Sequence, residues 1–237
     1  MKKITTFWIG GFHSVIAAIQ NKSRKVKQVI TTEYIAQLDK EQIKYKVVDK
    51  KIIKKIFRYS EFQTQNIAAE IEHLPKLELE NEIKKSEYKN IIILDGINDP
   101  RNIGSIVRTS VAFNINAIIL KEKDYNSTSA SMYKTASGGM EFIKIFDMTN
   151  LTQAINLLKK NDYWIYGLDH KAVHSFDAKK LSQKNAFIFG AEGSGITKNI
   201  KEKCDYLIKL NTNQQMGSLN VSNAVSATLS LVNLNSF

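Results

Sequence analysis

The sequence predicts an α/β protein built from two domains, on three observations. Short apolar runs with strand character alternate along the chain with runs whose apolar residues are spaced as on a helix. Polar clusters rich in glycine, asparagine or serine follow several of the apolar runs in the second half. A charged stretch that holds Pro75, one of only two prolines, separates a shorter first part from a longer second part. Such alternation favours a mostly parallel sheet with helices on both faces.

The first domain is expected over residues 1–74. Its expected elements, in order, are a helix at 13–19, a strand at 26–30, a helix at 34–41, a strand at 45–48 and a basic helix at 50–57. Asp49 stands directly before the basic helix and can cap it. Residues 75–89 carry a run of alternating charges and are expected to form a solvated linker.

The second domain is expected over residues 90–237. It begins with a strand at 91–95, and the turn at Asp99-Pro100 leads to a helix opened by Asn102. The other expected strands are 117–120, 141–146, 163–168, 186–189 and 206–210, and the other expected helices are 129–135, 151–160 and 220–234.

The composition is that of a globular protein and gives no sign of a membrane span, a disulfide framework or a metal site. The chain has 237 residues, of which 43% are hydrophobic and 24% charged, as in globular proteins. No apolar run approaches the ~18 residues of a membrane span, and the N-terminus lacks a signal-peptide pattern. The single Cys204 fits a reducing compartment, and the scattered histidines give no metal-ligand cluster. We therefore expect a cytoplasmic protein without a metal.

The charge balance is strongly basic. The formal net charge is +11, and most of the excess falls in residues 1–74. A polyanionic partner, most simply nucleic acid, accounts for this excess. Solubility combined with a lysine-rich codon bias accounts for it equally well, so charge alone leaves both explanations open.

Three polar clusters follow strand-like runs in the second domain. They lie at 102–108, 190–195 and 218–222. Ligands of open α/β sheets bind at the carboxyl ends of the strands, where such loops converge. A Walker loop is excluded because no Gly-Lys-Ser/Thr ends the 190–195 cluster, and its glycines do not have the spacing of a dinucleotide fingerprint. Taken singly, each cluster is more often an ordinary turn at a strand end.

The order and identity of these residues resemble the SpoU-type branch of the SPOUT RNA methyltransferases. The matching segments are Leu94-Asp95-Gly96, Asp99-Pro100-Arg101-Asn102-Ile103-Gly104, Arg108-Thr109, Gly190-Ala191-Glu192-Gly193-Ser194-Gly195-Ile196 and Ser218-Leu219-Asn220-Val221-Ser222, with support from Lys134-Thr135-Ala136-Ser137-Gly138-Gly139 and Glu141. The segment from Ile9 to Ile19, followed by Arg24, also resembles the small L30e-like substrate-binding domain that precedes many of these enzymes. Members with this extension methylate a guanosine ribose in large-subunit rRNA.

The resemblance implies a trefoil-knotted α/β methyltransferase domain that binds S-adenosylmethionine, uses no metal and works as a homodimer. By position, the donor site comprises Leu168, Gly190, Glu192, Gly195, Ile196, Leu210, Ser218 and Leu219. The implied catalytic residues are Arg108, Asn102, Glu192, Ser218 and Asn220. The substrate is RNA, most specifically a guanosine 2′-hydroxyl in 23S rRNA. A tRNA guanosine 2′-O-methyltransferase and a non-catalytic RNA-binding assembly protein are the alternatives.

Several of these residues have two possible roles. A ribose hydroxyl is a poor nucleophile, so Arg108 acts either as a perturbed base or by gripping the target phosphate, and we favour the second role because a free guanidinium has a pKa above ~12. Asn102 and Asn220 stand where an ordinary helix cap is also expected. The residues expected to contact RNA are His13, Arg24, Lys25, Arg101 and Arg108, with a structural histidine and a solvated basic face as the alternatives for the N-terminal ones.

Overall fold

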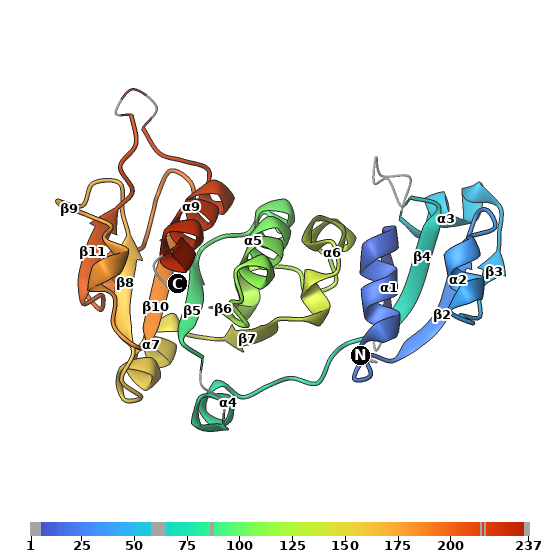
Figure 1. Cartoon of the computed structure of the whole chain (residues 1–237), viewed down its shortest axis with the longest axis horizontal. Helices are drawn as coiled ribbons and strands as arrows, with labels where there is room; N and C mark the ends of the chain where they lie inside the picture. The colour runs from blue at the N-terminus through green and yellow to red at the C-terminus, as the bar shows by residue number, and fades with distance from the viewer. Residues whose placement is uncertain (1–5, 58–64, 86–87, 214, 216, 235–237) are drawn as a thin grey trace. The chain divides into compact units, whose positions relative to one another are not determined.

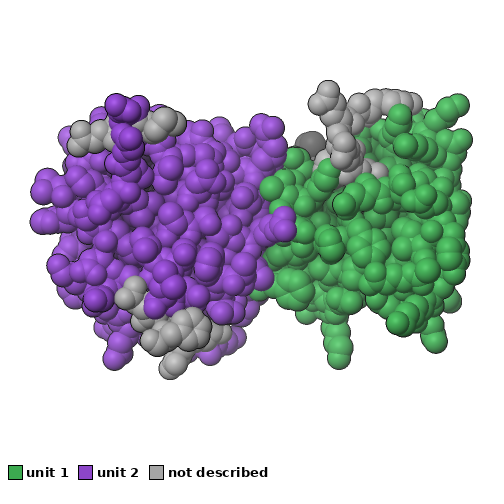
Figure 2. All heavy atoms as spheres, turned by 45° about the horizontal axis from the view of Figure 1, so that its top comes forward, with its two compact units in different colours: residues 1–75, 126–142 green, residues 76–125, 143–237 purple. Residues whose placement is uncertain are grey.

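A computed structural model describes residues 6–57, 65–85, 88–213, 215 and 217–234. The contacts divide the chain into two compact units (Figure 2). Unit 1 comprises residues 1–75 and 126–142, and unit 2 comprises residues 76–125 and 143–237. The segment 126–142, expected in the second domain, thus packs with the N-terminal residues.

Unit 1 is a four-stranded sheet with helices against it. The strand order is β1-β4-β2-β3, with β1 at Thr6–Gly10, β4 at Ile67–Glu72, β2 at Val26–Thr31 and β3 at Lys46–Val47. β4 pairs antiparallel with both β1 and β2, and β3 pairs parallel with β2. The inner strand β4 has four buried apolar residues, and its two glutamates, Glu70 and Glu72, are half-buried. Neither β1 nor β4 is among the strands expected from the sequence.

The helices of unit 1 are α1 at Phe12–Gln20, α2 at Ala36–Lys40, α3 at Lys50–Ile56 and α6 at Ala130–Ala136. The expected cap of α3 is confirmed, because the Asp49 carboxylate accepts from the backbone N–H of Lys51 at 2.7 Å. α6 contacts β1 and α1, and the Ser14 hydroxyl donates to the carbonyl of Tyr133 at 2.8 Å. Gly138 lies so close to α1 that a Cβ there would be 2.9 Å from that of Ala17.

Unit 2 is built on a seven-stranded parallel sheet, as the alternation of elements predicts. The order is β7-β6-β5-β10-β8-β11-β9 (Figure 1). Its strands are β5 at Asn90–Asp95, β6 at Ala117–Lys121, β7 at Lys144–Met148, β8 at Trp164–Leu168, β9 at His174–Ser175, β10 at Asn185–Gly190 and β11 at Tyr206–Lys209. The trefoil knot implied by the family resemblance stays a prediction.

Helices cover both faces of this sheet. α5 at Pro100–Ala112 and α9 at Val221–Leu234 lie against each other on one face (Figure 1). On the other face, α4 at Leu79–Lys85, α7 at Leu151–Lys159 and α8 at Lys198–Lys201 bury apolar side chains in a core with the strands. None of the described helices is long and apolar enough to cross a bilayer.

The segment 75–89, expected to form a solvated linker, is largely exposed in its described part but contains a short helix, α4, with a buried apolar side. Leu79 and Ile83, four residues apart on α4, and the following Tyr88 are all at least nine-tenths buried. The Tyr163 hydroxyl also donates to the carbonyl of Tyr88 at 2.6 Å. The apolar pair has helical spacing, but the charged residues around it conceal the signal, and only the core of unit 2 shows where it packs.

Candidate functional site

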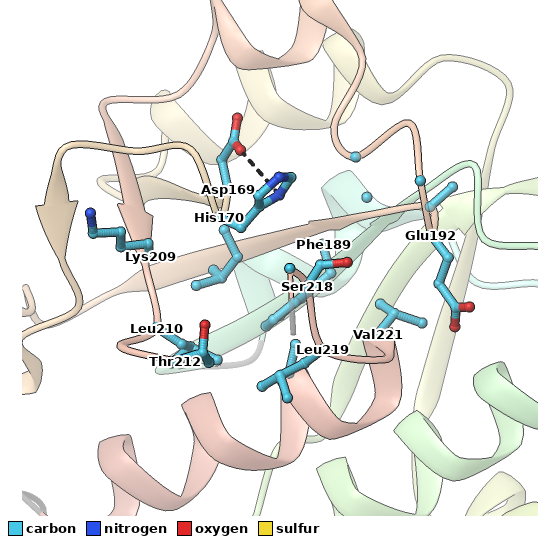
Figure 3. A pocket seen from close by; sticks show the side chains of 17 residues that line it. Asp169, His170, Phe189, Glu192, Lys209, Leu210, Thr212, Ser218, Leu219 and Val221 are labelled. Atoms are coloured by element: carbon cyan, nitrogen blue, oxygen red, sulfur yellow. Dashed lines mark ion pairs between the residues drawn. The ribbon is translucent and has the colours of Figure 1, made fainter. Parts of the chain in front are cut away.

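A pocket opens at the carboxyl ends of β8, β10 and β11 in unit 2 (Figure 3). It is lined by Leu168, Asp169, His170, Phe189, Gly190, Ala191, Glu192, Gly193, Gly195, Lys209, Leu210, Thr212, Gly217, Ser218, Leu219, Val221 and Ala224. Parallel strands place their following loops at one edge of the sheet, so segments far apart in the chain meet here. This edge is the place where the sequence predicts a ligand site.

Most residues expected to bind the donor line this pocket, namely Leu168, Gly190, Glu192, Gly195, Leu210, Ser218 and Leu219. Ile196 does not, because its side chain is buried among the apolar residues of the unit 2 core. The Ile196 side chain therefore has a packing role, and the expectation that Ile196 helps to complete the donor site stays a prediction. The structure also places Phe189, Lys209 and Val221 in the pocket lining, which the sequence analysis missed. Their positions at strand ends and at the start of a helix are the features from which they could have been predicted.

The loop after β10 is folded tightly on itself. Gly195 donates its backbone N–H to the carbonyl of Ala191 at 2.8 Å, and these two residues form an isolated bridge. A Cβ on Gly190 would lie 2.0 Å from the backbone carbon of Gly195, so only glycine fits. Gly193 and Gly195 have φ of +84° and +66°, a region that costs other residues energy. The glycines thus let the backbone form one wall of the pocket.

Three polar side chains from three motifs meet beside this pocket. The Asn102 amide donates to Glu192 Oε1 at 3.0 Å. The Asn220 amide donates to the same oxygen at 2.5 Å and to Asn102 Oδ1 at 3.1 Å. The three residues come from the first turn of α5, from the loop after β10 and from the residue before α9. We call Asn102, Glu192 and Asn220 the amide–carboxylate triad.

The two asparagines differ in their second role. Asn220 Oδ1 accepts from the backbone N–H of Ser222 at 2.9 Å, so Asn220 caps α9 as well as joining the triad. The alternative that Asn102 caps α5 is wrong. Asp99 caps that helix by accepting from the backbone N–H of Arg101 at 2.8 Å, with Pro100 at the first helical position. The Asn102 side chain is therefore free to bind Glu192.

Arg108 is not brought into the triad within one chain. It is exposed on α5, six residues after Asn102, which is about 9 Å along the axis and roughly 120° around it. Within the described part of the chain, its guanidinium makes no hydrogen bond or ion pair. Arg101, seven residues earlier, shares this side of the helix and pairs with Asp99 at 3.3 Å. Arg108 and Arg101 thus offer positive charge to the surroundings of α5.

On another side of the pocket lie Asp169 and His170, with His170 Nδ1 3.8 Å from Asp169 Oδ1 (Figure 3). Lys201 pairs with the other carboxylate oxygen of Asp169 at 2.6 Å. Burial acts to raise the pKa of Asp169, but hydrogen bonds from Lys201 and the Lys171 backbone outweigh it and hold the pKa below its ordinary value. The Asp169 carboxyl thus stays ionised on this side of the pocket.

The residues expected to contact RNA in unit 1 divide into two kinds. His13, in the first turn of α1, and Lys25, with a side chain 77% exposed, are open to solvent. Arg24 is corrected to a structural residue, because its side chain is only 2% exposed and binds both oxygens of Glu141, at 3.0 and 2.9 Å. Arg24 Nη1 also donates to the carbonyl of Glu72 at 2.7 Å. Each of its three guanidinium nitrogens thus has a partner inside unit 1.

Among the described residues, no group of three or more His, Cys, Asp or Glu side chains is arranged to hold a metal ion. The side chains around the pocket instead combine apolar walls, backbone edges and a few charges, which is the composition typical of an organic ligand site.

Comparison with known families gives two matches that together span most of the chain. The model of the SpoU rRNA Methylase family matches residues 89–230. The chain belongs to this family. The model for RNA 2′-O ribose methyltransferase substrate binding matches residues 8–77. The resemblance drawn from the motifs is thus confirmed at both ends of the chain.

Individual relatives are similar over different lengths. A Borreliella burgdorferi protein named as a tRNA/rRNA methyltransferase is 40% identical over 139 residues, which cover 59% of this chain and 61% of that one. The 23S rRNA (guanosine-2′-O-)-methyltransferase RlmB of Xylella fastidiosa is 34% identical over 59% of this chain and 56% of its own. A Staphylococcus aureus protein named for the TrmH family of tRNA/rRNA methyltransferases is 27% identical over 92% of both chains. The chain thus spans about three fifths of the length of the first two relatives.

Solved structures share the fold. The SpoU methyltransferase AviRb from Streptomyces viridochromogenes, in complex with AdoMet, superposes with a TM-score of 0.82 at 16% identity, covering 98% of this chain and 91% of that one. An AdoMet-bound rRNA methyltransferase from Sinorhizobium meliloti gives a TM-score of 0.80 at 20% identity, covering 98% and 88%. At these identities the likeness establishes the SpoU-type fold.

Proposed function

We propose that this protein transfers the methyl group of S-adenosylmethionine to a ribose 2′-hydroxyl in RNA, with a guanosine of large-subunit rRNA as its target. The observation that carries the proposal is the amide–carboxylate triad beside the strand-end pocket. Membership of the SpoU rRNA methylase family and the match of residues 8–77 to a substrate-binding model support it. The activity for which the Xylella fastidiosa relative is named supports the guanosine target.

The pocket has the chemistry that S-adenosylmethionine requires. Backbone groups at Gly190 and Leu210 are accessible to the edge of an adenine, since the backbone approaches closely where Gly190 has no side chain. Leu219 and Val221 provide apolar surface for the ring and the methylene groups. The Glu192 carboxylate gives the pocket a negative group suited to a sulfonium cation. When bound, the donor supplies an already activated methyl group.

The protein's own residues position the acceptor. The 2′-oxygen attacks the methyl carbon as the carbon–sulfur bond breaks, the sulfur keeps that electron pair, and the hydroxyl proton passes to solvent or a nearby acceptor. Asn102 and Asn220 both donate to Glu192 Oε1 and so hold this carboxylate in one orientation beside the acceptor. Arg108 grips a phosphate of the target nucleotide and aligns the hydroxyl. Alignment of this kind lowers the barrier without turning the guanidinium into a base.

A second copy of the chain is part of this proposal. Arg108 faces away from the triad of its own chain, so a site that contains both takes Arg108 from a neighbour. Exposed apolar side chains on the same face of unit 2, among them Trp164 and Tyr206 with stacked rings 5.7 Å apart and Leu234 on α9, support association through that face. A homodimer is therefore the proposed active form.

The test is methyl transfer from labelled S-adenosylmethionine to separate pools of unmethylated rRNA and tRNA, with wild type and Arg108→Ala in parallel. The proposal expects label in large-subunit rRNA with wild type and at least a tenfold loss in the variant. Label in tRNA alone would keep the chemistry and overturn the target. RNA binding without transfer to rRNA, tRNA or a ribosomal particle would favour an assembly protein.

A further inference from the structure

A buried carboxylate lies behind the donor pocket without lining it. Asp95 is the last residue of β5, and its side chain is fully buried. Its Oδ2 accepts from the backbone N–H and from the hydroxyl of Thr197, both at 2.8 Å. Its Oδ1 accepts from Lys121 Nζ at 2.9 Å. The carboxylate thus has three donors in an interior where an unpaired charge would be costly.

These contacts fix both ends of the loop 190–197. At its start, Gly190 is paired with Asp95 in the parallel register of β10 and β5. At its end, Thr197 is held by the Asp95 side chain, although 102 residues separate the two in sequence. Gly96, directly after Asp95, approaches the same loop, since a Cβ there would lie 3.8 Å from that of Ala191. One residue therefore closes the loop that forms a wall of the pocket.

The Thr197 side chain binds Asp95 and does not cap the following helix. Thr197 stands at the cap position of α8, yet its side chain makes no capping hydrogen bond to that helix. Its hydroxyl donates to Asp95 instead. Thr197 thus forgoes the stabilisation that a threonine cap usually gives a helix. We infer that its side chain serves to hold the loop 190–197 against β5.

We propose that Asp95 is a positioning residue of the donor site, which acts through Thr197 to hold the loop 190–197 in the conformation that binds S-adenosylmethionine. This inference rests on the proposed function for the identity of the ligand. It assigns to Asp95 an effect on donor affinity, because the loop carries Glu192 and the backbone wall of the pocket. Asn102 and Asn220 also hold Glu192, independently of Thr197, so the rate of transfer at saturating donor should change less than donor affinity.

The experiment compares Asp95→Asn, Thr197→Val and Thr197→Ser with the wild-type full chain. Donor affinity is measured by calorimetry with S-adenosylmethionine, and KM and kcat by methyl transfer to rRNA. Asp95→Asn is expected to raise Kd and KM for the donor at least tenfold, with kcat within about threefold of wild type. Thr197→Val should show a smaller rise, and Thr197→Ser, which keeps the hydroxyl, should restore wild-type affinity.

A matched control separates positioning from general destabilisation. Glu82→Gln makes the same acid-to-amide change in unit 2, where Glu82 binds Lys144 and lies outside the residues that line the pocket. It should leave Kd for S-adenosylmethionine unchanged. If Asp95→Asn does not fold, the result for Thr197→Val tests the proposal instead. An unchanged Kd for S-adenosylmethionine in a folded variant of either residue would overturn the proposal, as would a fall in kcat without a rise in Kd.

A second readout needs no ligand. Amide hydrogen exchange of residues 190–197 in the free protein should be faster in Asp95→Asn and in Thr197→Val, and unchanged in Glu82→Gln. Equal exchange in all four proteins would overturn the anchoring role. If the exchange rates differ among the variants as expected but the wild type does not bind S-adenosylmethionine, the proposed function is refuted. The anchoring role of Asp95 would then still hold.

Discussion

Arg24 and Glu141, 117 residues apart, form a doubly hydrogen-bonded ion pair whose side chains are 2% and 1% exposed. Asn21 adds a hydrogen bond to Glu141 Oε2 at 2.8 Å. The pair ties the segment 126–142 to the sheet and helices of unit 1. Unit 1 is therefore completed by the segment 126–142, which lies in the sequence between β6 and β7 of unit 2.

Loss of one partner of this pair should destabilise unit 1 strongly. Glu141→Ala leaves the Arg24 guanidinium buried without its carboxylate, which typically costs about 3–5 kcal/mol. Urea unfolding followed by Trp8 fluorescence in a Trp164→Phe background measures this, since the chain has only two tryptophans. Lys27→Met removes a more exposed ion pair with Glu72 and should leave the midpoint almost unchanged. Equal midpoints for the two variants would refute the role given to Glu141.

The two roles of Asn220 can be separated by one substitution. Asn220→Asp keeps an oxygen that can accept from Ser222 and so preserves the cap of α9, but it loses the N–H groups that bind Glu192 and Asn102. We expect a folded protein that keeps the cap of α9, with kcat/KM lowered at least tenfold, because a hydrogen bond to a charged group is lost and a second carboxylate now stands against Glu192. Ser222→Ala, which touches only the capping side, should keep kcat/KM within a few-fold. Full activity in Asn220→Asp would remove Asn220 from the triad.

Gly190 should tolerate no side chain. In Gly190→Ala the new Cβ would overlap the backbone of Gly195, so the loop 190–197 must move and donor binding should be lost. Gly193→Ala is the matched control, since its Cβ would meet nothing within 4 Å and the cost is only that of its positive φ, about 1 kcal/mol. Calorimetry with S-adenosylmethionine distinguishes the two. Comparable affinity in both variants would show that the loop does not shape the pocket.

Acid should destabilise unit 2 through its buried carboxylates. Burial alone would raise the pKa of Asp95, but hydrogen bonds from Thr197 and Lys121 hold it below the ordinary 3.8. Since the folded pKa is the lower one, the stabilisation is complete above the unfolded value and disappears as pH falls through the folded value. Unfolding free energy measured from pH 6 down to pH 2 should therefore fall below about pH 4, and less steeply in Asp95→Asn. An identical slope in that variant would contradict the assigned charge state.

The sequence predicts unit 2 well because its signals are local. Apart from the two-residue strand β9, the strands of the parallel sheet coincide with short apolar runs. The motifs around Asn102, Glu192 and Asn220 follow strand ends or begin a helix. The rule that such ends share one edge of a sheet was enough to bring the three motifs together. The strand-end pocket lies at that edge for the same reason.

What the sequence could not show depends on contacts between distant segments. Arg24 looks like one more charge in a basic turn, and only its packing against the segment 126–142 reveals that it is buried. Asp95 ends an ordinary strand, and its partner Thr197 becomes a neighbour only through the order of strands in the sheet. The side of α5 that carries Arg108 likewise follows from where the helix packs.

The most direct test of the account is to map ribose methylation, nucleotide by nucleotide, on unmethylated large-subunit rRNA after incubation with S-adenosylmethionine and either wild type or Arg108→Ala. The account predicts one 2′-O-methylguanosine with wild type and its loss in the variant, while both proteins bind the donor equally. Methylation confined to a base, or a 2′-O-methyl group formed equally well by Arg108→Ala, would contradict it.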